Sequence, residues 1–228
     1  MTRLRSAGWS GTGDRLISGK LRAIEGVGHA VCLPRAGKAA SPLEAIGTTE
    51  ERVLRVRQVH GTRLVEWSEP AETIPEGDGV LVRRPGAWAG IRTADCVPLL
   101  LVGEGALAVV HAGWRGTLAG IAALAVGALG GEARAMTAVL GPHIGACCYE
   151  VAEELGGRFR ERFGASVVRP NGHLGLGAAI RSDLERAGVM ADRIFEGAPC
   201  TYCDPRAFPS WRREGEGAGR LLTLVGFE

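Results

Sequence analysis

The sequence has very little lysine, few aromatic residues and only five histidines. Lysine occurs at Lys20 and Lys38 alone, while arginine is spread along the chain, and the formal net charge is +2. There is no polybasic arm of the kind that binds nucleic acid or an anionic membrane surface. We therefore expect no nucleic-acid partner.

Long hydrophobic runs are also missing. The longest ones, "CVPLLLV" and "GALAVVHAG", have the length of strands and fall well short of the roughly 20 apolar residues that a membrane-spanning helix needs. The first 20 residues carry basic side chains without the apolar segment of a secretory signal. These absences predict a cytoplasmic protein with no membrane partner. In that compartment we expect thiols or metal ligands rather than disulfides at the cysteines, which are Cys32, Cys96, Cys147, Cys148, Cys200 and Cys203.

The chain contains enough apolar residues, 46% of 228, to bury a sizeable core. Short apolar runs separated by Gly and Pro predict strands that are buried on both faces. Predicted strands cover 53–60, 63–68, 78–84, 87–94, 97–102, 106–112, 135–142 and 219–227. The first two flank Gly61 and Thr62, which favours a strand pair or a sharp turn.

Helical periodicity appears in three segments. Residues 117–129 have apolar positions at helical spacing with Thr117 as a candidate N-cap, and 150–163 and 176–187 follow, the last ending before Gly188. Residues 1–50 are rich in Gly and Ala and have weak periodicity. No repeat or low-complexity linker divides the chain. We predict one α+β domain over residues 1–228, with mixed β-sheets covered by helices.

Three side chains stand at the ends of predicted strands, where a pocket would meet them. His60 lies in "RQVHGT", Cys96 in "RTADCVPLL" and His111 in "VVHAGWRG". Two imidazoles and one thiolate suit zinc with a fourth position open to substrate. The spacing is not a compact metal motif, so a buried cysteine beside two hydrogen-bonded histidines is the alternative interpretation.

The same residues also fit nucleophilic catalysis. Cys96 would be the nucleophile, His111 or His60 its base, and Asp95 the group that orients the base. A second interpretation of Asp95 is that it accepts hydrogen bonds where the strand begins.

The turn "HAGWRGT" predicts an anion site, because backbone N–H groups at a helix start and the guanidinium of Arg115 favour phosphate or carboxylate. A glycine turn whose Arg115 pairs with a local carboxylate is the alternative. His143 follows a predicted strand and is either a pocket residue or a turn histidine. The pairs Cys147–Cys148 and Cys200–Cys203 favour buried thiols, because adjacent cysteines are poor partners for one ion and a lone C-x-x-C is weak evidence for zinc.

Several segments together resemble the YfiH-like family, long labelled multicopper polyphenol oxidase or laccase-domain proteins. They are "RQVHG", "DGVLV", "TADCVPLLLV", "VVHAGWRGTLAGI", "LGPHIGACCYEV" and the tail "CTYC…FPSWRR…GR", and the resemblance runs from about residue 53 to the C-terminus. The family's usual "F-x-T-R-x-G-G" stretch is absent from the divergent first 50 residues, where "HAVCLPRAG" offers only Arg35 and Gly37 as remnants.

The resemblance implies a single α+β domain in which His60, Cys96 and His111 bind a metal ion. It also implies a zinc-dependent purine nucleoside phosphorylase acting on adenosine, inosine or methylthioadenosine with phosphate, and adenosine deaminase activity. In this interpretation Arg115 fixes the phosphate, and Asp95, His143 or water gives a proton to the departing purine.

Other functions remain open at this stage. One is a cysteine- or zinc-dependent amidase or hydrolase that edits peptidoglycan precursors, and another is a non-catalytic metal-binding protein. Copper could take the place of zinc in a polyphenol oxidase. A blue-copper centre takes two histidines and one cysteine, however, and a further copper cluster would need more imidazoles than the three that remain.

Overall fold

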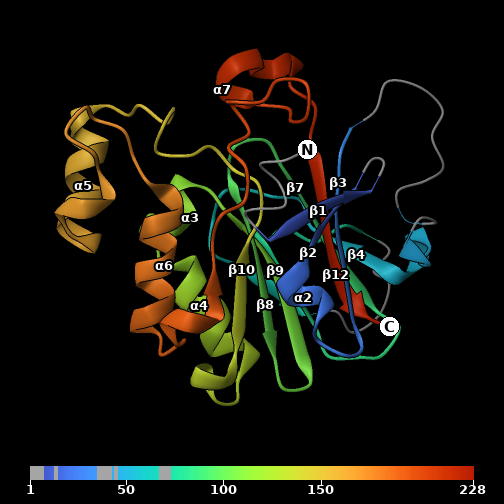
Figure 1. Cartoon of the computed structure of the whole chain (residues 1–228). Helices are drawn as coiled ribbons and strands as arrows, with labels where there is room; N and C mark the ends of the chain where they lie inside the picture. Colours follow the sequence, from blue (N-terminus) through green and yellow to red (C-terminus); the bar gives the residue numbers. More distant parts are fainter. Residues whose placement is uncertain (1–7, 13–14, 35–42, 44–45, 67–72) are drawn as a thin grey trace.

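The computed structural model describes residues 8–12, 15–34, 43, 46–66 and 73–228, which form two six-stranded sheets and a set of helices (Figure 1). The first sheet has the strand order β1 (Trp9–Thr12), β2 (Arg15–Ser18), β3 (Val27–Cys32), β12 (Leu221–Phe227), β7 (Trp88–Thr93) and β4 (Val53–Arg55). The second has the order β11 (Ile194–Phe195), β10 (Thr137–Leu140), β8 (Val97–Gly103), β9 (Ala106–Ala112), β6 (Gly79–Val82) and β5 (Leu64–Glu66). Both sheets are mixed, because β4–β7, β5–β6 and β10–β11 pair in parallel and the other neighbours are antiparallel.

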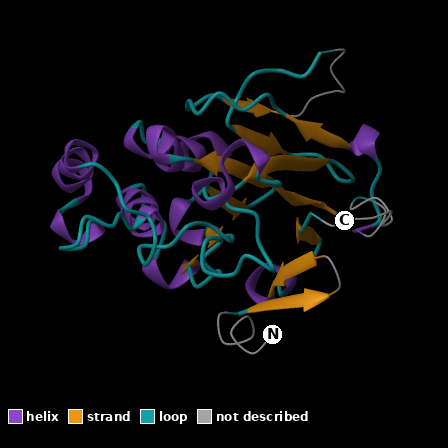
Figure 2. Cartoon of the chain, turned by 90° about the horizontal axis from the view of Figure 1, so that it is seen from above, coloured by secondary structure: helices purple, strands orange, loops and turns teal. Residues whose placement is uncertain are grey.

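The central strands β8 and β9 are buried on both faces, which explains their uninterrupted apolar sequences. Side chains alternate along a strand, so Leu99 and Leu101 pack toward the helices while Leu100 and Val102 pack toward the first sheet, where they join residues such as Ile91. Seen from above, most helices lie on one side of the strands (Figure 2). The predicted α+β class, with mixed sheets covered by helices, is confirmed.

The α-helices among the described residues are α2 (Gly19–Arg22), α3 (Trp114–Leu118), α4 (Ile121–Leu129), α5 (Glu153–Phe163), α6 (Leu176–Arg186) and α7 (Trp211–Glu214). The prediction of one helix over 117–129 is wrong. Gly120 has φ +83, a left-handed conformation that ends α3 and precedes α4. Thr117 is therefore an interior residue of α3 and not an N-cap, and the N-cap position belongs to Gly113.

The predicted pair of strands around Gly61 does not form. β4 belongs to the first sheet and β5 to the second, so of the two expectations, a strand pair or a sharp turn, the strand pair is excluded and the chain crosses between the sheets. Residues 67–68 of the predicted strand lie outside the described residues.

The first 50 residues contribute more structure than their periodicity indicated. β1, β2 and β3 form one side of the first sheet and α2 follows β2, whereas Arg35 and Gly37 lie outside the described residues. In the described part of the chain, none of the helices has both the length and the apolar character that crossing a bilayer requires.

Candidate active site

His60, Cys96 and His111 meet at one end of the second sheet. Cys96 directly precedes β8 and His111 lies near the end of β9, and the antiparallel register pairs Val97 with Ala112, which brings the two side chains together. His60 comes from the crossing loop. The ligand atoms of these three residues, called here the three-residue group, all lie within 4.8 Å of one another. The expected convergence of these residues, which spacing alone could not establish, is present in the structure.

One fully buried carboxylate, that of Asp78, holds two members of the group in place. Its Oδ1 accepts a hydrogen bond of 2.8 Å from Nδ1–H of His111 and one of 2.9 Å from the backbone N–H of His60. Its Oδ2 accepts from the N–H groups of Gly61, at 2.7 Å, and Val59, at 3.2 Å. With Nδ1 engaged, the Nε2 atom of His111 is the one left to bind a ligand.

Backbone strain accompanies this arrangement. His60 has φ +60, in the left-handed region that residues other than glycine rarely adopt. The three hydrogen bonds from residues 59–61 to Asp78 compensate for that conformation and fix where the His60 ring points. The His60 and His111 rings lie with their centroids 4.8 Å apart and their planes at 82°.

The electrostatics of the group favour a thiolate. Burial raises the pKa of Cys96, but hydrogen bonds and charge attraction from His111 and His60 outweigh it and lower that pKa to about 7. Burial lowers the pKa of His111, and the opposing contacts with Asp78 and Cys96 raise it to about 9. For Asp78, burial raises the pKa, and the hydrogen bonds from His111 and the backbone hold it below its usual value.

The donor set fits a divalent metal. Two imidazoles and a thiolate are ligands of borderline-soft ions such as zinc, and copper also accepts them. Gly113 supports the fit, because a Cβ there would lie 3.1 Å from Sγ of Cys96 and within 4 Å of both rings. A glycine at this position leaves all three ligand side chains unobstructed.

A cavity of about 760 Å³ opens over the group. Cys96 and His60 line it together with three aromatic side chains, Trp114, Tyr149 and Trp211. The complete lining is Gln58, His60, Arg92, Ala94, Asp95, Cys96, Trp114, Arg115, Ile144, Tyr149, Leu176, Trp211, Arg212 and Arg220. Its volume lies within the range of about 300–1,000 Å³ that is usual for small-molecule sites.

Four arginines give the cavity wall a positive charge. Arg115, Arg212 and Arg220 lie over the rings of Trp114, Tyr149 and Trp211 respectively, at 4.4, 5.2 and 5.2 Å from the ring centroids. Arg92 is the fourth. Arg115 lies in α3 at the cavity, as expected, and its guanidinium contacts the ring of Trp114. Guanidinium groups on several elements suit a phosphate, since each presents several N–H donors.

Asp95 is the only carboxylate among the lining residues, and it is already engaged. Its Oδ1 accepts a hydrogen bond of 2.5 Å from Thr201, and its Oδ2 accepts bonds of 2.9 and 2.7 Å from Ser210 and from the backbone N–H of Arg212. Its φ of +84 is again left-handed. These bonds fit the interpretation of Asp95 as a hydrogen-bond acceptor at the strand entrance, and they tie the segment 201–212 to the second sheet.

His143 lies beside the cavity rather than among its lining residues. Its Nδ1–H donates to the carbonyl of Gly141 at 2.8 Å, and a Cβ at Gly177 of α6 would lie 3.0 Å from its Nε2. Burial lowers the pKa of His143, which keeps the ring neutral. Its role in proton transfer stays a prediction.

Sequence reasoning missed several residues of this site. Asp78 was visible in the quoted segment "DGVLV", where an acidic residue stands directly before a buried strand, but its partners come from a distant loop. Tyr149, Trp211, Arg92 and Arg212 carried no spacing signal. Burial raises the pKa of Tyr149 to about 12, with the charge of Cys96 adding to the effect, so its phenol stays protonated.

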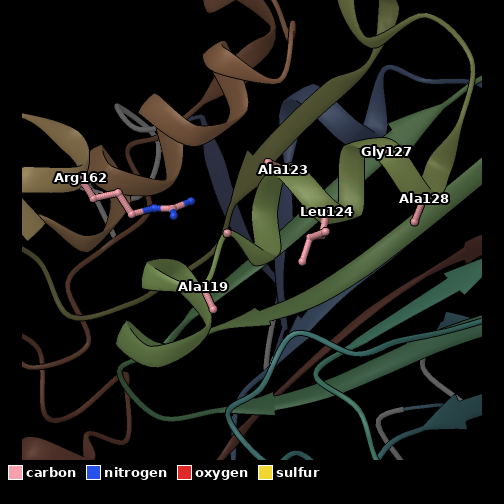
Figure 3. Close-up of a pocket in the computed structure, with 7 residues that line it drawn as sticks. Ala119, Ala123, Leu124, Gly127, Ala128 and Arg162 are labelled. Atoms are coloured by element: carbon pink, nitrogen blue, oxygen red, sulfur yellow. The ribbon is translucent and has the colours of Figure 1, made fainter.

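A second hollow, of about 560 Å³, lies over α4 and has a different chemistry (Figure 3). Its lining consists of Ala119, Gly120, Ala123, Leu124, Gly127, Ala128 and Arg162. Arg162 is the titratable residue among them, and it pairs with Asp183 at 3.2 Å. The hollow offers no second polar group for a substrate.

Comparison with known proteins shows the family of the chain. The model of the family described as multi-copper polyphenol oxidoreductase laccase matches residues 37–228. The chain belongs to this family. The family match confirms the resemblance and extends it toward the N-terminus, past the beginning near residue 53 that the motifs indicated.

Curated relatives of the chain carry enzyme names. A purine nucleoside phosphorylase of Deinococcus radiodurans is 35% identical over 201 residues, which cover 85% of this chain and 77% of the relative. A protein from an unidentified prokaryote named adenosine deaminase RL5 is 35% identical, with coverages of 79% and 77%. The crystal structure of the Bacillus licheniformis protein YfiH superposes with a TM-score of 0.85 at 22% identity, covering 96% of this chain and 99% of that one. This last likeness shows a shared fold.

Proposed function

We propose that the protein is a zinc-dependent purine nucleoside phosphorylase with an additional adenosine deaminase activity. The observation that carries the proposal is the single cavity that joins the three-residue group to arginines and aromatic rings. The names of the curated relatives support it. A cytoplasmic location and a single domain over residues 1–228 remain predictions.

The reaction divides among the residues of the cavity. Phosphorolysis forms a bond between a phosphate oxygen and C1′ of the ribose, breaks the bond from C1′ to N9, and adds a proton to the purine. Arg115 and Arg92, with Arg212 and Arg220 nearby, would bind phosphate and offset its charge. Trp114, Tyr149 and Trp211 present rings against which a purine can stack.

His60, Cys96 and His111 would hold the metal. Zinc held by these residues would supply a Lewis acid for an oxygen nucleophile, which is phosphate in phosphorolysis and water in deamination. Asp78 keeps His111 in the tautomer that presents Nε2 and keeps the His60 loop in register. The proton for the leaving purine comes from water, Asp95 or His143, and the engaged carboxylate of Asp95 favours water.

The family description names a multi-copper oxidoreductase. The contacts of the three histidines outside the three-residue group argue against such an activity in this protein. Nε2 of His29 accepts a hydrogen bond from the backbone of Ser18, and the rings of His143 and His173 bond to backbone carbonyls. These three imidazoles lie outside the three-residue group, so the described histidines form no second cluster of imidazoles for further copper ions.

One observation favours a second candidate, a cysteine hydrolase. The pKa of Cys96 is lowered to about 7 beside two histidines, which is also the setting of a nucleophilic thiol. The peptidoglycan-editing amidase is therefore kept as an alternative.

The deciding experiment measures metal content and turnover on one sample. Adenosine and inosine are assayed with and without phosphate, and products are separated as free base, ribose 1-phosphate, ribose and inosine. About one zinc in the three-residue group with phosphate-dependent ribose 1-phosphate supports the proposal. Metal without turnover would favour the non-catalytic metal-binding protein. Rapid alkylation of Cys96 that zinc does not prevent would favour the hydrolase.

A further inference from the structure

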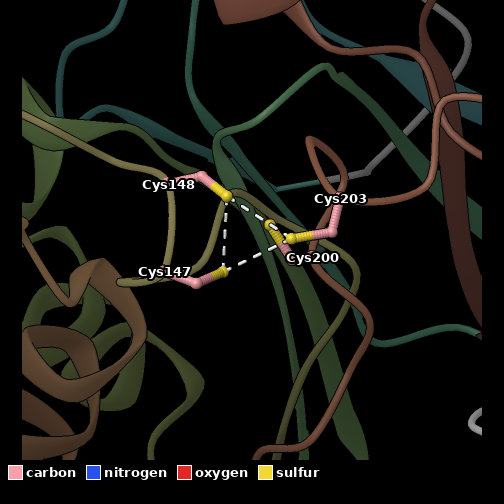
Figure 4. A group of neighbouring side chains, drawn as sticks. All are labelled: Cys147, Cys148, Cys200 and Cys203. Atoms are coloured by element: carbon pink, nitrogen blue, oxygen red, sulfur yellow. Dashed lines mark hydrogen bonds between the residues drawn. The ribbon is translucent and has the colours of Figure 1, made fainter.

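Four cysteine side chains from two separate loops converge outside the candidate active site (Figure 4). Cys147 and Cys148 belong to the loop after β10, and Cys200 and Cys203 to the loop before α7. Three of the sulfur pairs are 3.4, 3.5 and 3.6 Å apart, and the four sulfur atoms all lie within 4.8 Å of one another. We call these residues the four-cysteine group.

These sulfur distances are close to those of a tetrahedral zinc site. Zinc binds thiolate sulfur at about 2.3 Å, so the sulfur atoms at the corners of such a site are about 3.8 Å apart. Because Cys147 and Cys148 are adjacent in sequence, we did not expect them to share an ion. Both residues lie in a turn, however, which brings their sulfur atoms to the same side. The sequence has no second C-x-x-C to match Cys200–Cys203, but the fold brings Cys147 and Cys148 next to that pair.

The expectation of buried thiols is also wrong in part. Cys147 and Cys203 are exposed, whereas Cys148 and Cys200 are partly buried, and all four are free cysteines. Four thiols that contact mainly one another at a surface gain little stability, because a thiol is a weak hydrogen-bond donor and acceptor. A bound cation would explain why the four thiols gather at one place.

The backbone around the group is arranged for it. The N–H of Gly145 donates to Sγ of Cys200 at 3.2 Å, a contact that stabilises a thiolate. A Cβ at Gly145 would lie 3.2 Å from Sγ of Cys147 and 3.7 Å from Sγ of Cys200. Arg213 donates to the carbonyls of Thr201 and Tyr202, placing a positive charge beside the loop.

We propose that the four-cysteine group binds one zinc ion through four thiolates, as a structural site distinct from the three-residue group. Four Zn–S bonds form as the four thiols release their protons to solvent, with no change of oxidation state. Four protein ligands leave no position open for substrate, in contrast to a catalytic zinc.

The role of this site follows from the two loops it joins. The first loop carries Ile144 and Tyr149 and the second leads into Trp211 and Arg212, all of which line the cavity. The loops also meet through the hydrogen bond from Thr201 N–H to the His143 carbonyl and the neighbouring bridge, and Arg212 lies over the ring of Tyr149. Zinc would fasten these loops together and so hold part of the cavity wall.

The test counts zinc per chain in the full-length protein purified with a reductant and without chelators. We expect about two zinc ions in the parent protein and about one in each of Cys96→Ser and Cys203→Ser. The double variant should contain none. Cys32→Ser is the matched control, since Cys32 lies in β3 outside both groups, and it should retain both ions.

A second measurement keeps the test decisive if Cys203→Ser fails to fold. X-ray absorption at the zinc edge of Cys96→Ser, which keeps only the four-cysteine group, should show a shell of sulfur alone at about 2.3 Å. Hydrogen exchange in residues 143–149 and 200–212 should accelerate when zinc is removed from this variant. Both readouts are independent of turnover, so they stand even if the phosphorylase proposal fails.

Several results would overturn the inference. A parent protein with a single zinc that Cys203→Ser retains would do so, and so would a nitrogen-containing shell or iron in place of zinc. A disulfide within the group in the reduced preparation, seen as the loss of two hydrogens in the intact mass, would also contradict it.

Discussion

The three-residue group and the four-cysteine group both bring ligand atoms within 4.8 Å of one another, yet their surroundings differ. The first lies at the end of a buried sheet, is held by a fully buried carboxylate, and opens into a cavity of about 760 Å³. The second lies between two loops, two of its cysteines are exposed, and its sulfur atoms contact mainly one another. Three ligands beside a cavity are typical of a reaction site, whereas four protein ligands without an open position are typical of a structural site.

Two buried histidines show how a candidate metal ligand differs from a histidine with a structural contact. His111 and His29 are both buried, but His111 donates to Asp78 whereas His29 accepts a hydrogen bond from the backbone of Ser18. Their pKa values move in opposite directions, to about 9 and about 4. Burial alone does not distinguish a metal-binding histidine. A hydrogen bond from one ring nitrogen to a carboxylate, which leaves the other nitrogen for the metal, is the distinguishing feature.

The largest effect is expected from Cys96→Ser. Loss of one of three metal ligands should lower kcat/KM for phosphorolysis by roughly a thousandfold or more, because the activated oxygen nucleophile is lost. The measurement is initial rate with inosine and phosphate, together with zinc content. A variant that loses its zinc and keeps full turnover would show that the three-residue group is not the reaction site.

Asp78→Asn should have the next largest effect. An amide cannot accept all the hydrogen bonds that the carboxylate receives from His111 and the His60 loop, so zinc affinity should fall by up to about a hundredfold. Competition with a metal-binding dye measures the affinity of the three-residue group in the Cys203→Ser background. Asp183→Asn is the matched control, because that buried carboxylate pairs with Arg162 away from the cavity. If Asp78→Asn and the parent bound zinc with equal affinity, Asp78 would not position the ligands of the three-residue group.

His29 provides a pH test on a buried histidine without a carboxylate partner. Burial lowers its pKa from 6.5 to about 4, so between these values the unfolded chain binds a proton that the folded chain does not. Stability that is present at neutral pH is therefore lost as the pH falls below 6.5. Urea unfolding at about pH 5 and about pH 7 should differ by about 2 kcal/mol from this residue. His29→Gln should show a correspondingly smaller difference, and identical pH dependence in both proteins would contradict the assignment.

Much of the fold could be predicted from the sequence, because its signals are local. Continuous apolar runs predicted β6 to β10 and β12, and the predicted ends lie within about two residues of the observed ones. Strands that are buried on both faces need apolar side chains at every position. The break at Gly120 was missed because glycine is tolerated inside a helix, and only the backbone conformation shows that it ends one.

Parts of the sites depended on contacts between distant segments, which periodicity does not contain. His60, Cys96 and His111 were recognised from their strand-end settings and from family motifs. Asp78 and the arginines of the cavity were not, because their partners lie far along the chain. The four-cysteine group was judged from each pair separately, whereas contacts between the two loops, among them the bridge between His143 and Cys200, bring the pairs together.

The smallest effect is expected from Arg115→Ala, which tests whether the arginines make the cavity of the three-residue group a phosphate site. Removing one charge-assisted contact at a solvent-facing guanidinium should raise KM for phosphate by roughly tenfold, and KM for inosine should change little. Steady-state rates with each substrate varied in turn measure the two values.

Arg115→Lys and Arg134→Ala separate charge from shape in this test. Lysine keeps the positive charge but loses the planar group that lies over Trp114, so its KM for phosphate should fall between those of the parent and the alanine variant. Arg134 pairs with Glu132 on the surface away from the cavity, and its removal should leave both KM values unchanged. If Arg115→Ala raised KM for inosine and not for phosphate, the side chain would be holding the purine through Trp114. The anion would then belong to Arg92, Arg212 and Arg220, the other arginines that line the cavity.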